Sequence, residues 1–476
     1  MLSSRSARFR RVIHWIGWKA FACPPILVAL GCSTPPRPAT AIAPKSSCVI
    51  SAAAPTPAET ISVAVTGPID PARIPTPANS AERFVFAQLY ETLIDIDCEG
   101  HAYPGLASSW TLDATRTRVT LVIRDDARFW NGKPVTASDV VAAWRATGGQ
   151  STESSRLVRR LADAATVDDD RALTVSLPDS AWLVLADPAL AISQPQPGSA
   201  WAQGSGSYRV DSDATVGSGL VVLVPFSPHA APPIVARNRP SADPRDAIDA
   251  GADLIVTSDA AAVSYAATRA NLSAVPLPWN RAYVLAVPGF IPDSARASLL
   301  SMANDPELRA SLAGDAVHAE ARPAAPPYWW SGIQGCTSIS AAGSAAGASG
   351  GRPSRRIVYR RNDGVARGLA ERLVAVGRGM SAAGLAPSDF ARALRDAQDL
   401  AYVFDLPRAS LSPCQDLTVL VSAAPWLTDG AGNGPSADKL LPLIDTRARA
   451  IVNRDHVSAM IDWDGTLRIA GRSRQP

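Results

Sequence analysis

Residues 121–146, "LVIRDDARFWNGKPVTASDVVAAWRA", change from a strand-like to a helix-like hydrophobic pattern within one short stretch. Leu121 and Ile123 lie two residues apart, which is typical of a strand with one buried face. Asn131-Gly132 then indicates a tight turn, because both residues tolerate positive φ. The stretch therefore predicts a strand and a turn before residue 136.

The predicted helix that follows carries its own start signal. Thr136 is placed to cap this helix, and Asp139 at the third helical position can reach back to its start. Val140, Val141 and Trp144 recur at helical spacing, so we expect their side chains to face the interior.

Strand and helix patterns alternate along the rest of the chain. "TISVAV" (60–65) predicts the strand that opens the globular part, and residues 81–97 predict an amphipathic helix. Later strand patterns are "RALTVSL" (171–177), "GLVVLVP" (219–225), "RIVYRR" (356–361) and "LAYVFDL" (400–406). Helix patterns are "VARGLAERLVAVGRGM" (365–380), "DFARALRDAQ" (389–398) and the start of "DAIDAGADLIVTS" (246–258), which runs into a strand. This order predicts α/β units built on sheets.

The composition indicates a globular chain with more than one domain. The chain has 476 residues, of which 47% are hydrophobic and 19% charged, which excludes a disordered or fully membrane-embedded protein. The 40 prolines and 32 glycines indicate many loops and at least one linker.

The first 31 residues have the pattern of an export signal. Five basic residues and no acidic residue precede "AFACPPILVALG" (20–31), an apolar stretch too short for a comfortable membrane span. "VALGC" (28–32) resembles a bacterial lipobox, in which Cys32 is lipid-modified and becomes the new N-terminus. The alternative is an ordinary secretory signal with an incidental cysteine. Loss of the five basic residues lowers the formal net charge from +3 to −2, so no basic patch predicts nucleic-acid binding.

The residues after the signal suit an exported protein. Residues 33–58 are rich in proline, alanine and serine, which predicts an extended tether. With Cys32 set aside, Cys48, Cys98, Cys336 and Cys414 remain, an even number that predicts disulfides in an oxidising compartment and leaves three pairings open. We find neither a CxxC spacing nor a Cys/His cluster in the sequence, so we expect no zinc site.

Motifs between about residues 60 and 290 resemble the family-5 extracellular solute-binding proteins of ABC importers, the peptide- and nickel-binding group. These motifs are "LYETL" (89–93), "YPGLASSWTLD" (103–113), the turn and helix of residues 131–141, and "GSGSYRV" (204–210), in which Ser207 stands in place of the family's proline. "DAGADLIVTS" (249–258) and "VPLPWNRAYVLAV" (275–287) are similar to the strand that crosses from the first lobe to the second, and "LLPLIDTRARAIV" (440–452) to the returning segment.

The resemblance implies an α/β, bilobal periplasmic-binding-protein-like fold, with two mixed-sheet lobes joined by crossing strands. We expect a signal peptide at 1–31, a tether at 32–58, lobe I at 59–278, lobe II at 279–435 and a return segment to lobe I at 436–476. Lobe II is short and divergent, with a Gly-, Ala- and Ser-rich run at 337–354. In this division, Cys48–Cys98 and Cys336–Cys414 would each stay within one lobe.

The resemblance also implies a set of ligand-binding residues. In peptide-binding members an aspartate of the second lobe pairs with the ligand's amino group, and "VFDLPRASLSPCQD" (403–416) offers Asp405 for this role. In this stretch Ser412-Pro413 replaces the family's Asp-Pro, and Asp405 could instead be a strand-end residue in a turn. Trp182, Trp279, Tyr283 and Trp426 fall in segments that border the family's cleft, with packing in a core or hinge as the alternative for each.

The sequence contains no motif that predicts an active site. "GASGG" (347–351) formally fits the Gly-x-Ser-x-Gly hydrolase pattern around Ser349, but it lies in a low-complexity run with no preceding strand. The five histidines are scattered, and we find no HExxH, P-loop or dinucleotide fingerprint. We therefore predict no enzyme activity, no resident metal and no cofactor.

The sequence thus predicts a lipid-anchored solute-binding protein of the periplasm or cell surface. It would capture a peptide or similar small solute between its lobes and deliver it to ABC permease subunits in the membrane. The alternative is a degenerate relative that transports nothing and acts as an interaction or sensory lipoprotein, which the short second lobe would favour. An exported hydrolase is a third possibility, but it lacks a placed nucleophile and base.

Overall fold

The computed structural model describes most of the chain between residues 46 and 469. The described residues are 46–52, 59–149, 153–177, 182–215, 217, 219–226, 232–239, 243–289, 293–303, 305–307, 321–323, 356–376, 380–397, 400–409, 411, 413–428 and 439–469. Cys32, Cys336, Ser349 and the run at 337–354 lie outside the described residues. Within the described part, no helix is both long and apolar enough to cross a membrane.

A mixed seven-stranded sheet forms the base of the first lobe. Its strands, in spatial order, are β13 (Leu272–Pro276), β20 (Arg449–Asn453), β12 (Leu254–Thr257), β2 (Ile61–Val65), β11 (Ile234–Asn238), β10 (Leu220–Pro225) and β9 (Tyr208–Val210). Strand β2 is parallel to both of its neighbours and alternates buried and half-buried side chains. The strands predicted at 60–65 and 219–225 are therefore confirmed.

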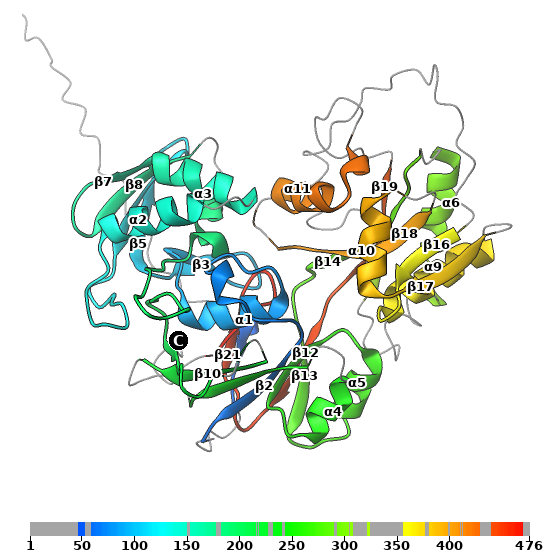
Figure 1. Ribbon diagram of the computed structural model, residues 1–476, viewed down its shortest axis with the longest axis horizontal. Helices are drawn as coiled ribbons and strands as arrows, with labels where there is room; N and C mark the ends of the chain where they lie inside the picture. The colour runs from blue at the N-terminus through cyan, green and yellow to red at the C-terminus, as the bar shows by residue number, and fades with distance from the viewer. Residues whose placement is uncertain are drawn as a thin grey trace, which may run out of the picture. The chain divides into compact units, whose positions relative to one another are not determined.

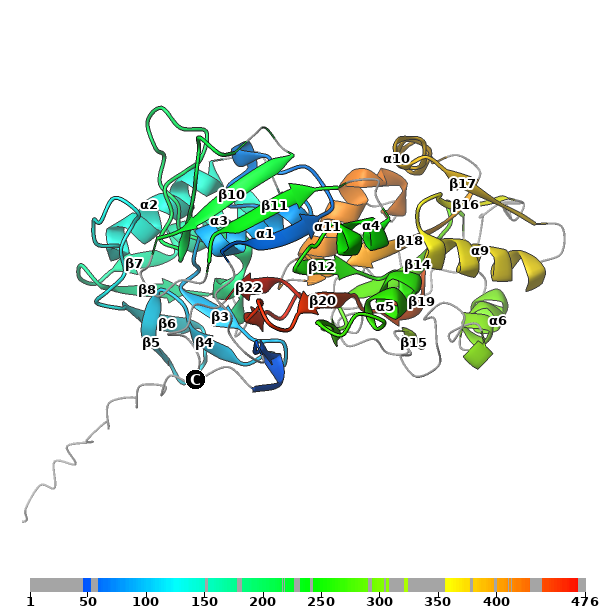
Figure 2. The same cartoon turned by 90° about the horizontal axis from the view of Figure 1, so that it is seen from below.

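Helices cover both faces of this sheet. Helix α1 (Ser80–Leu89) packs on one face, where Leu254 and Val452 point toward it, and Figure 2 shows it beside β10 and β11. Helices α4 (Pro244–Asp249) and α5 (Ala260–Ala266) pack on the opposite face against Ile255 and Ile451, as Figure 1 shows beside β12 and β13. Alternate residues of a strand thus bury opposite faces, as the strand period of two requires.

The helix predicted over 81–97 ends earlier in the structure. Helix α1 ends at Leu89, and a short strand, β3 (Ile94–Ile96), pairs with β4 (Ala102–Pro104). The chain of Gly204–Gly206 packs against this helix end, where the Gly206 N–H donates to the Leu89 carbonyl at 2.9 Å. A Cβ atom on Gly204 would lie 2.1 Å from that same carbonyl oxygen, so only glycine allows this approach.

A four-stranded antiparallel sheet carries the module at residues 121–146. Its order is β5 (Ala107–Leu112), β6 (Arg118–Ile123), β8 (Ala172–Ser176) and β7 (Ala165–Val167), packed with α2 (Ala137–Gly148) and α3 (Glu153–Asp163). Thr136 and Asp139 form a full capping box at the start of α2, and Gly132 adopts a φ of +82° in the preceding turn. Val140, Val141 and Trp144 are buried, so the prediction for this module is confirmed.

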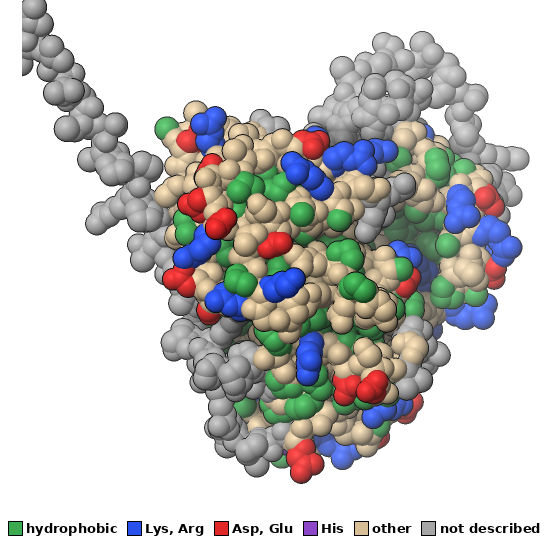
Figure 3. All heavy atoms as spheres, turned by 60° about the vertical axis from the view of Figure 1, so that its left-hand side comes forward, with side chains coloured by type: hydrophobic (Ala, Val, Ile, Leu, Met, Phe, Trp, Pro, Cys, Tyr) green, Lys and Arg blue, Asp and Glu red, His purple; other side chains and the backbone are tan. Residues whose placement is uncertain are grey.

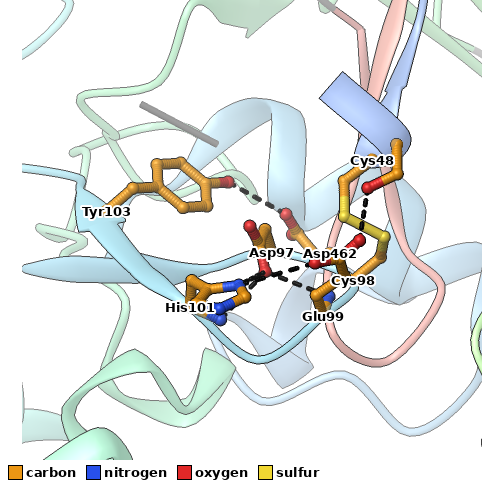
Figure 4. Close-up of a disulfide and its surroundings, with 8 residues drawn as sticks. Cys48, Asp97, Cys98, Glu99, His101, Tyr103 and Asp462 are labelled. Atoms are coloured by element: carbon orange, nitrogen blue, oxygen red, sulfur yellow. Dashed lines mark hydrogen bonds and ion pairs between the residues drawn. A yellow bond between two sulfur atoms is a disulfide. The ribbon is translucent and has the colours of Figure 1, made fainter. Parts of the chain in front are cut away.

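A small sheet and a disulfide join the start of the described chain to the first lobe. Strand β1 (Val49–Ile50) pairs with β21 (Ala459–Ile461), which pairs with β22 (Leu467–Ile469). Cys48 is bonded to Cys98 (Figure 4). Within residues 32–58, which we expected to form a tether, Ser46–Ile50 are thus folded because a covalent bond and a strand pairing hold them.

The second lobe is built on a mixed six-stranded sheet. Its order is β15 (Ala321–Pro323), β19 (Leu440–Thr446), β14 (Arg281–Ala286), β18 (Ala401–Pro407), β16 (Arg356–Arg360) and β17 (Ser381–Leu385). Helices α6 (Asp293–Ala303) and α9 (Gly364–Val376) pack on one face. Helices α10 (Pro387–Arg395) and α11 (Pro413–Ala423) pack on the other. The strands and helices predicted at 356–361, 365–380, 389–398 and 400–406 are confirmed.

Candidate functional site

Two short segments carry the chain between the sheets of the two lobes. Strand β13 ends at Pro276 in the first sheet, and β14 begins at Arg281 in the second. Strand β19 ends at Thr446 in the second sheet, and β20 begins at Arg449 in the first. Arg281 pairs in register with Thr446, and Pro276 with Arg449, so the two segments run side by side. Side chains from both sheets therefore meet at this crossing.

A pocket of about 140 Å³ lies at the crossing. It is walled by β2 and β12, by the start of α1, by the turn before β22 and by the crossing segments themselves. Its polar lining residues are Thr66, Ser80, Arg83, Asn280, Arg281, Asp464 and Thr466. Because residues of the first lobe and Arg281 of β14 share this lining, a ligand in the pocket would contact both lobes.

Arg83 is fixed in the first turn of α1. Asn79 caps that helix by accepting hydrogen bonds from the N–H groups of Ala81 and Glu82. The Arg83 Nη1 atom lies 2.7 Å from the Asp464 carboxylate, and both side chains are largely buried. Arg83 Nη2 donates to the carbonyl of Ala409, 2.8 Å away, in the segment that follows β18. Arg83 therefore links the first lobe to the second at the edge of the pocket.

The same segment after β18 makes further contacts with first-lobe residues. The Arg408 guanidinium carbon lies 4.6 Å from the centre of the Trp463 ring, a cation–π contact. The Leu411 N–H donates to the buried carboxylate of Asp187, 3.3 Å away. Burial raises the pKa of Asp187, while the hydrogen bonds from the N–H groups of Ala189 and Leu411 lower it.

Asp405 lies among arginines on the second sheet. Its Oδ1 atom accepts a hydrogen bond from Arg360 Nη1 at 2.8 Å, and its Oδ2 atom lies 3.4 Å from Arg281 Nε. Tyr283 stands opposite Asp405 in the strand register and donates its hydroxyl to Asp363, 3.1 Å away. Burial raises the pKa of both Tyr283 and Asp363. Asp405 is thus part of a charged network within the lobe.

The three predicted tryptophans lie in three different surroundings, apart from Tyr283. Trp182, in the 3₁₀ helix η3 (Trp182–Ala186), packs against Trp110 in the core of the four-stranded sheet. Trp279 lies in the crossing segment, with the Arg447 guanidinium 4.7 Å from its ring centre. Trp426, in the 3₁₀ helix η6 (Pro425–Leu427), donates to the Leu394 carbonyl and packs against Tyr402.

None of the five predicted ligand-binding residues lines the 140 Å³ pocket as the structure describes it. Their binding role therefore stays a prediction. Arg83, Arg281 and Asp464 were not selected from the sequence. The sequence holds one signal that could have pointed to this site: Arg281 is the charged first residue of an otherwise buried strand at the predicted crossing.

A buried group of charged residues supports the turn that holds Asp464. Asp462 accepts hydrogen bonds from Arg468 Nε at 2.7 Å and from the Tyr103 hydroxyl at 3.1 Å, and Figure 4 shows Tyr103 pointing at it. Arg468 also pairs with Asp95 at 2.8 Å. Burial raises the pKa of Asp462 to about 7, although Arg468 opposes this shift. Within the described residues, no group of three or more His, Cys, Asp or Glu side chains could hold a metal ion.

A larger hollow of about 710 Å³ lies elsewhere in the first lobe. Its lining includes Asp70, Glu82 and Trp201 and comes entirely from first-lobe loops and the start of α1. Binding sites occur preferentially at domain interfaces, where a ligand can draw both sides together. We therefore select the smaller pocket at the crossing as the candidate site.

The surface carries charges of both signs. On the face shown in Figure 3, acidic and basic side chains are interspersed over the surface.

The Cys48–Cys98 disulfide is present, whereas Cys414 lies in α11 with its side chain outside the described part.

Sequence comparison gives matches confined to short stretches. Residues 101–231 match the profile described as "Bacterial extracellular solute-binding proteins, family 5 Middle". The periplasmic oligopeptide-binding protein OppA of Haemophilus influenzae is 45% identical over 64 residues, which are 13% of this chain and 12% of OppA. The nickel-binding periplasmic protein of Escherichia coli is 33% identical over 101 residues, 21% of this chain and 18% of that protein.

Structure comparison extends the likeness of fold over most of the chain. A dipeptide-binding protein of Pseudoalteromonas sp. SM9913, solved with Met-Leu, matches with a TM-score of 0.62 at 13% identity, covering 86% of this chain and 98% of that one. The E. coli murein tripeptide-binding protein MppA matches with a TM-score of 0.58 at 14% identity, covering 86% and 97%. The predicted α/β bilobal fold is thereby confirmed. The sequence likeness to family 5 is thus confined to residues 101–231, whereas the likeness of fold to solute-binding proteins extends over most of the chain.

Proposed function

We propose that this protein is the solute-capturing component of an ABC importer. It binds a peptide or similar small solute outside the cytoplasm and delivers it to permease subunits in the membrane. The observation that carries the proposal is the pocket at the crossing, because its lining combines first-lobe residues with Arg281 of the second lobe. A ligand that contacts both lobes favours their closed arrangement, and closure around a ligand is a common switching mechanism.

The relatives support this assignment through their own ligands. Matching proteins are named for binding oligopeptides, dipeptides and nickel. The sequence matches to the curated relatives cover only 12 to 18% of those proteins, so ligand and partners are proposed here for this chain. Capture and delivery require no catalytic residue, which agrees with the lack of a catalytic motif in the sequence.

The proposal includes a location and a division of the chain. Cys32 would carry a lipid anchor in a bacterial membrane, with the protein in the periplasm or at the cell surface. The Cys48–Cys98 disulfide supports an oxidising compartment. The lobes would run from 59 to 278 and from 279 to 435, with 436–476 returning to the first lobe.

Native mass spectrometry of the soluble form that starts after Cys32 tests the function. The protein should be purified from the host's export compartment and measured before and after denaturation. We expect a small-molecule adduct that is lost on denaturation and whose mass gives the solute class. If the protein is empty and a peptide and metal library produces no thermal shift, the transport function is wrong. The interaction or sensory lipoprotein would then be tested by searching for a protein partner.

A further inference from the structure

We propose that three residues of the segment after β18, Arg408, Ala409 and Leu411, form an interlobe latch that holds the second lobe against the first in the solute-free protein. A solute could then enter between the lobes only after this contact breaks. The inference goes beyond the proposed function, because it concerns how the empty protein is held together and does not depend on which solute is captured.

The second lobe itself fixes the shape of the latch. The segment lies between the end of β18 and the start of α11. The Arg408 N–H donates to the carbonyl of Asn280 in the crossing segment, 2.7 Å away. The Ala409 N–H donates to the carboxylate of Asp416 in the first turn of α11, 3.1 Å away. The latch is therefore ordered by its own lobe, which lowers the entropy cost of its contact with the first lobe.

Two first-lobe side chains hold the backbone of the latch. Arg83 Nη2 donates to the Ala409 carbonyl at 2.8 Å. The Leu411 N–H donates to Asp187 Oδ2 at 3.3 Å. Asp187 is only 3% exposed, and its other oxygen accepts from the Ala189 N–H, 3.0 Å away in the first lobe. One oxygen of a buried carboxylate is thus satisfied by the second lobe, and such a group is costly to leave without a partner.

The side chains of the latch add apolar and cation–π contacts to the first lobe. Leu411 packs against the hydrophobic core of the four-stranded sheet, α2 and α3. The Arg408 guanidinium carbon lies 4.6 Å from the ring centre of Trp463, which is 6% exposed. Residues of α11 also contact α3 (Figure 1). The latch therefore buries apolar surface as well as forming hydrogen bonds.

The latch joins a part of the first lobe that the crossing segments do not reach. The crossing segments connect the second lobe to the seven-stranded sheet, and a hinge of this kind alone would let the lobes rotate apart. Leu411 instead connects the second lobe to the core of the four-stranded sheet. This second attachment restricts the rotation, so the lobes stay together without a solute. The apparent affinity for a solute then falls with the fraction of molecules that are open.

Small-angle X-ray scattering of the empty protein tests the latch. The soluble form that starts after Cys32 is unfolded in denaturant without reductant, dialysed and refolded. Native mass spectrometry then confirms that no small molecule remains bound. Leu411→Asp should have a larger radius of gyration than the wild type, because it places a carboxylate against an apolar core and close to Asp187.

Val419→Asp is the matched control. It introduces the same charge on α11 at a position that is 55% exposed, so it should keep the radius of gyration of the wild type. Circular dichroism confirms that each variant is folded. If Leu411→Asp does not fold, Leu411→Ala replaces it, and a smaller increase in the radius is expected because only the apolar contact is lost.

Two results would overturn the latch. One is a radius of gyration for the folded Leu411 variant equal to that of the wild type. The other is an equal increase for Val419→Asp, which would place the effect outside the contact with the first lobe. Either result leaves solute capture standing, because the adduct carried from the host tests capture separately. A protein that carries no adduct and binds no solute of the library, but expands on Leu411→Asp, would disprove capture and support the latch.

Discussion

Arg83 and Asp464 form an ion pair of 2.7 Å between the first turn of α1 and the turn before β22, with side chains only 16% and 3% exposed. The same arginine donates to the Ala409 carbonyl in the segment after β18. One guanidinium thus connects two elements of the first lobe with a segment of the second.

Replacing Arg83 with Gln should lower the free energy of unfolding by about 3 kcal/mol, because it leaves the buried Asp464 carboxylate without its cation. Urea unfolding followed by circular dichroism measures this change. Arg392→Gln is the control, since Arg392 pairs with Asp389 on an exposed helix surface and its loss should cost less than about 1 kcal/mol. Equal effects of the two substitutions would show that the buried pair has no special role in stability.

Gly206→Ala should destabilise the protein by about 2 kcal/mol or more, because overpacking against rigid backbone cannot relax cheaply. The new Cβ would lie 2.4 Å from the Gln88 carbonyl oxygen and 2.6 Å from the Leu89 carbonyl carbon at the end of α1. Gly219→Ala is the matched control, since its Cβ would meet no atom within 4 Å. Thermal unfolding of both variants measures the change in melting temperature. An unchanged melting temperature for Gly206→Ala would refute the close packing of Gly206 against the backbone of Gln88 and Leu89.

Local sequence patterns predict some of the elements in this lobe but not the end of α1. The start of α2 could be predicted from Thr136 and Asp139, and β2 from its alternating residues. Both predictions succeed because helix capping and strand burial depend on residues that are close in the sequence. The end of α1 at Leu89 depends instead on a glycine segment more than a hundred residues later. The helical spacing continued past Leu89, and only tertiary packing explains why the helix does not.

The candidate site was harder to predict for a similar reason. Arg83 lay within a predicted helix, but its partner Asp464 is 381 residues away in the sequence. Asp405 was selected by resemblance, whereas its two arginine partners come from neighbouring strands whose order the sequence does not state. Ion pairs between distant segments produce no periodic pattern in the sequence. They could therefore be identified only once the order of the strands in the sheets was known.

Replacing both Cys48 and Cys98 with Ser should lower the free energy of unfolding by about 4 kcal/mol, the loop-closure value for a separation of 50 residues. Strand β1 pairs through only two residues, so the folded start of the described chain depends largely on this bond. Denaturant titration of the double variant measures the loss. Reductant is added to the variant as a control, because any further change would come from the remaining cysteines. A loss below about 1 kcal/mol would mean that the closed loop contributes little.

The raised pKa of Asp462 gives a stability that depends on pH. In the unfolded chain this carboxyl loses its proton near its ordinary pKa of about 4, but in the folded protein it does so near 7. Between these values the folded state holds more protons, so this contribution falls as pH rises from about 4 to 7. Asp462→Asn cannot titrate, so the difference in unfolding free energy between wild type and variant should shrink as pH rises through that window. Asp113→Asn is the control: Asp113 is exposed, and a hydrogen bond from Thr115 lowers its pKa, so it titrates below the window. A difference between wild type and Asp462→Asn that stays constant from pH 4 to 7 would show that Asp462 is ionised throughout, with the charge of Arg468 outweighing the effect of burial.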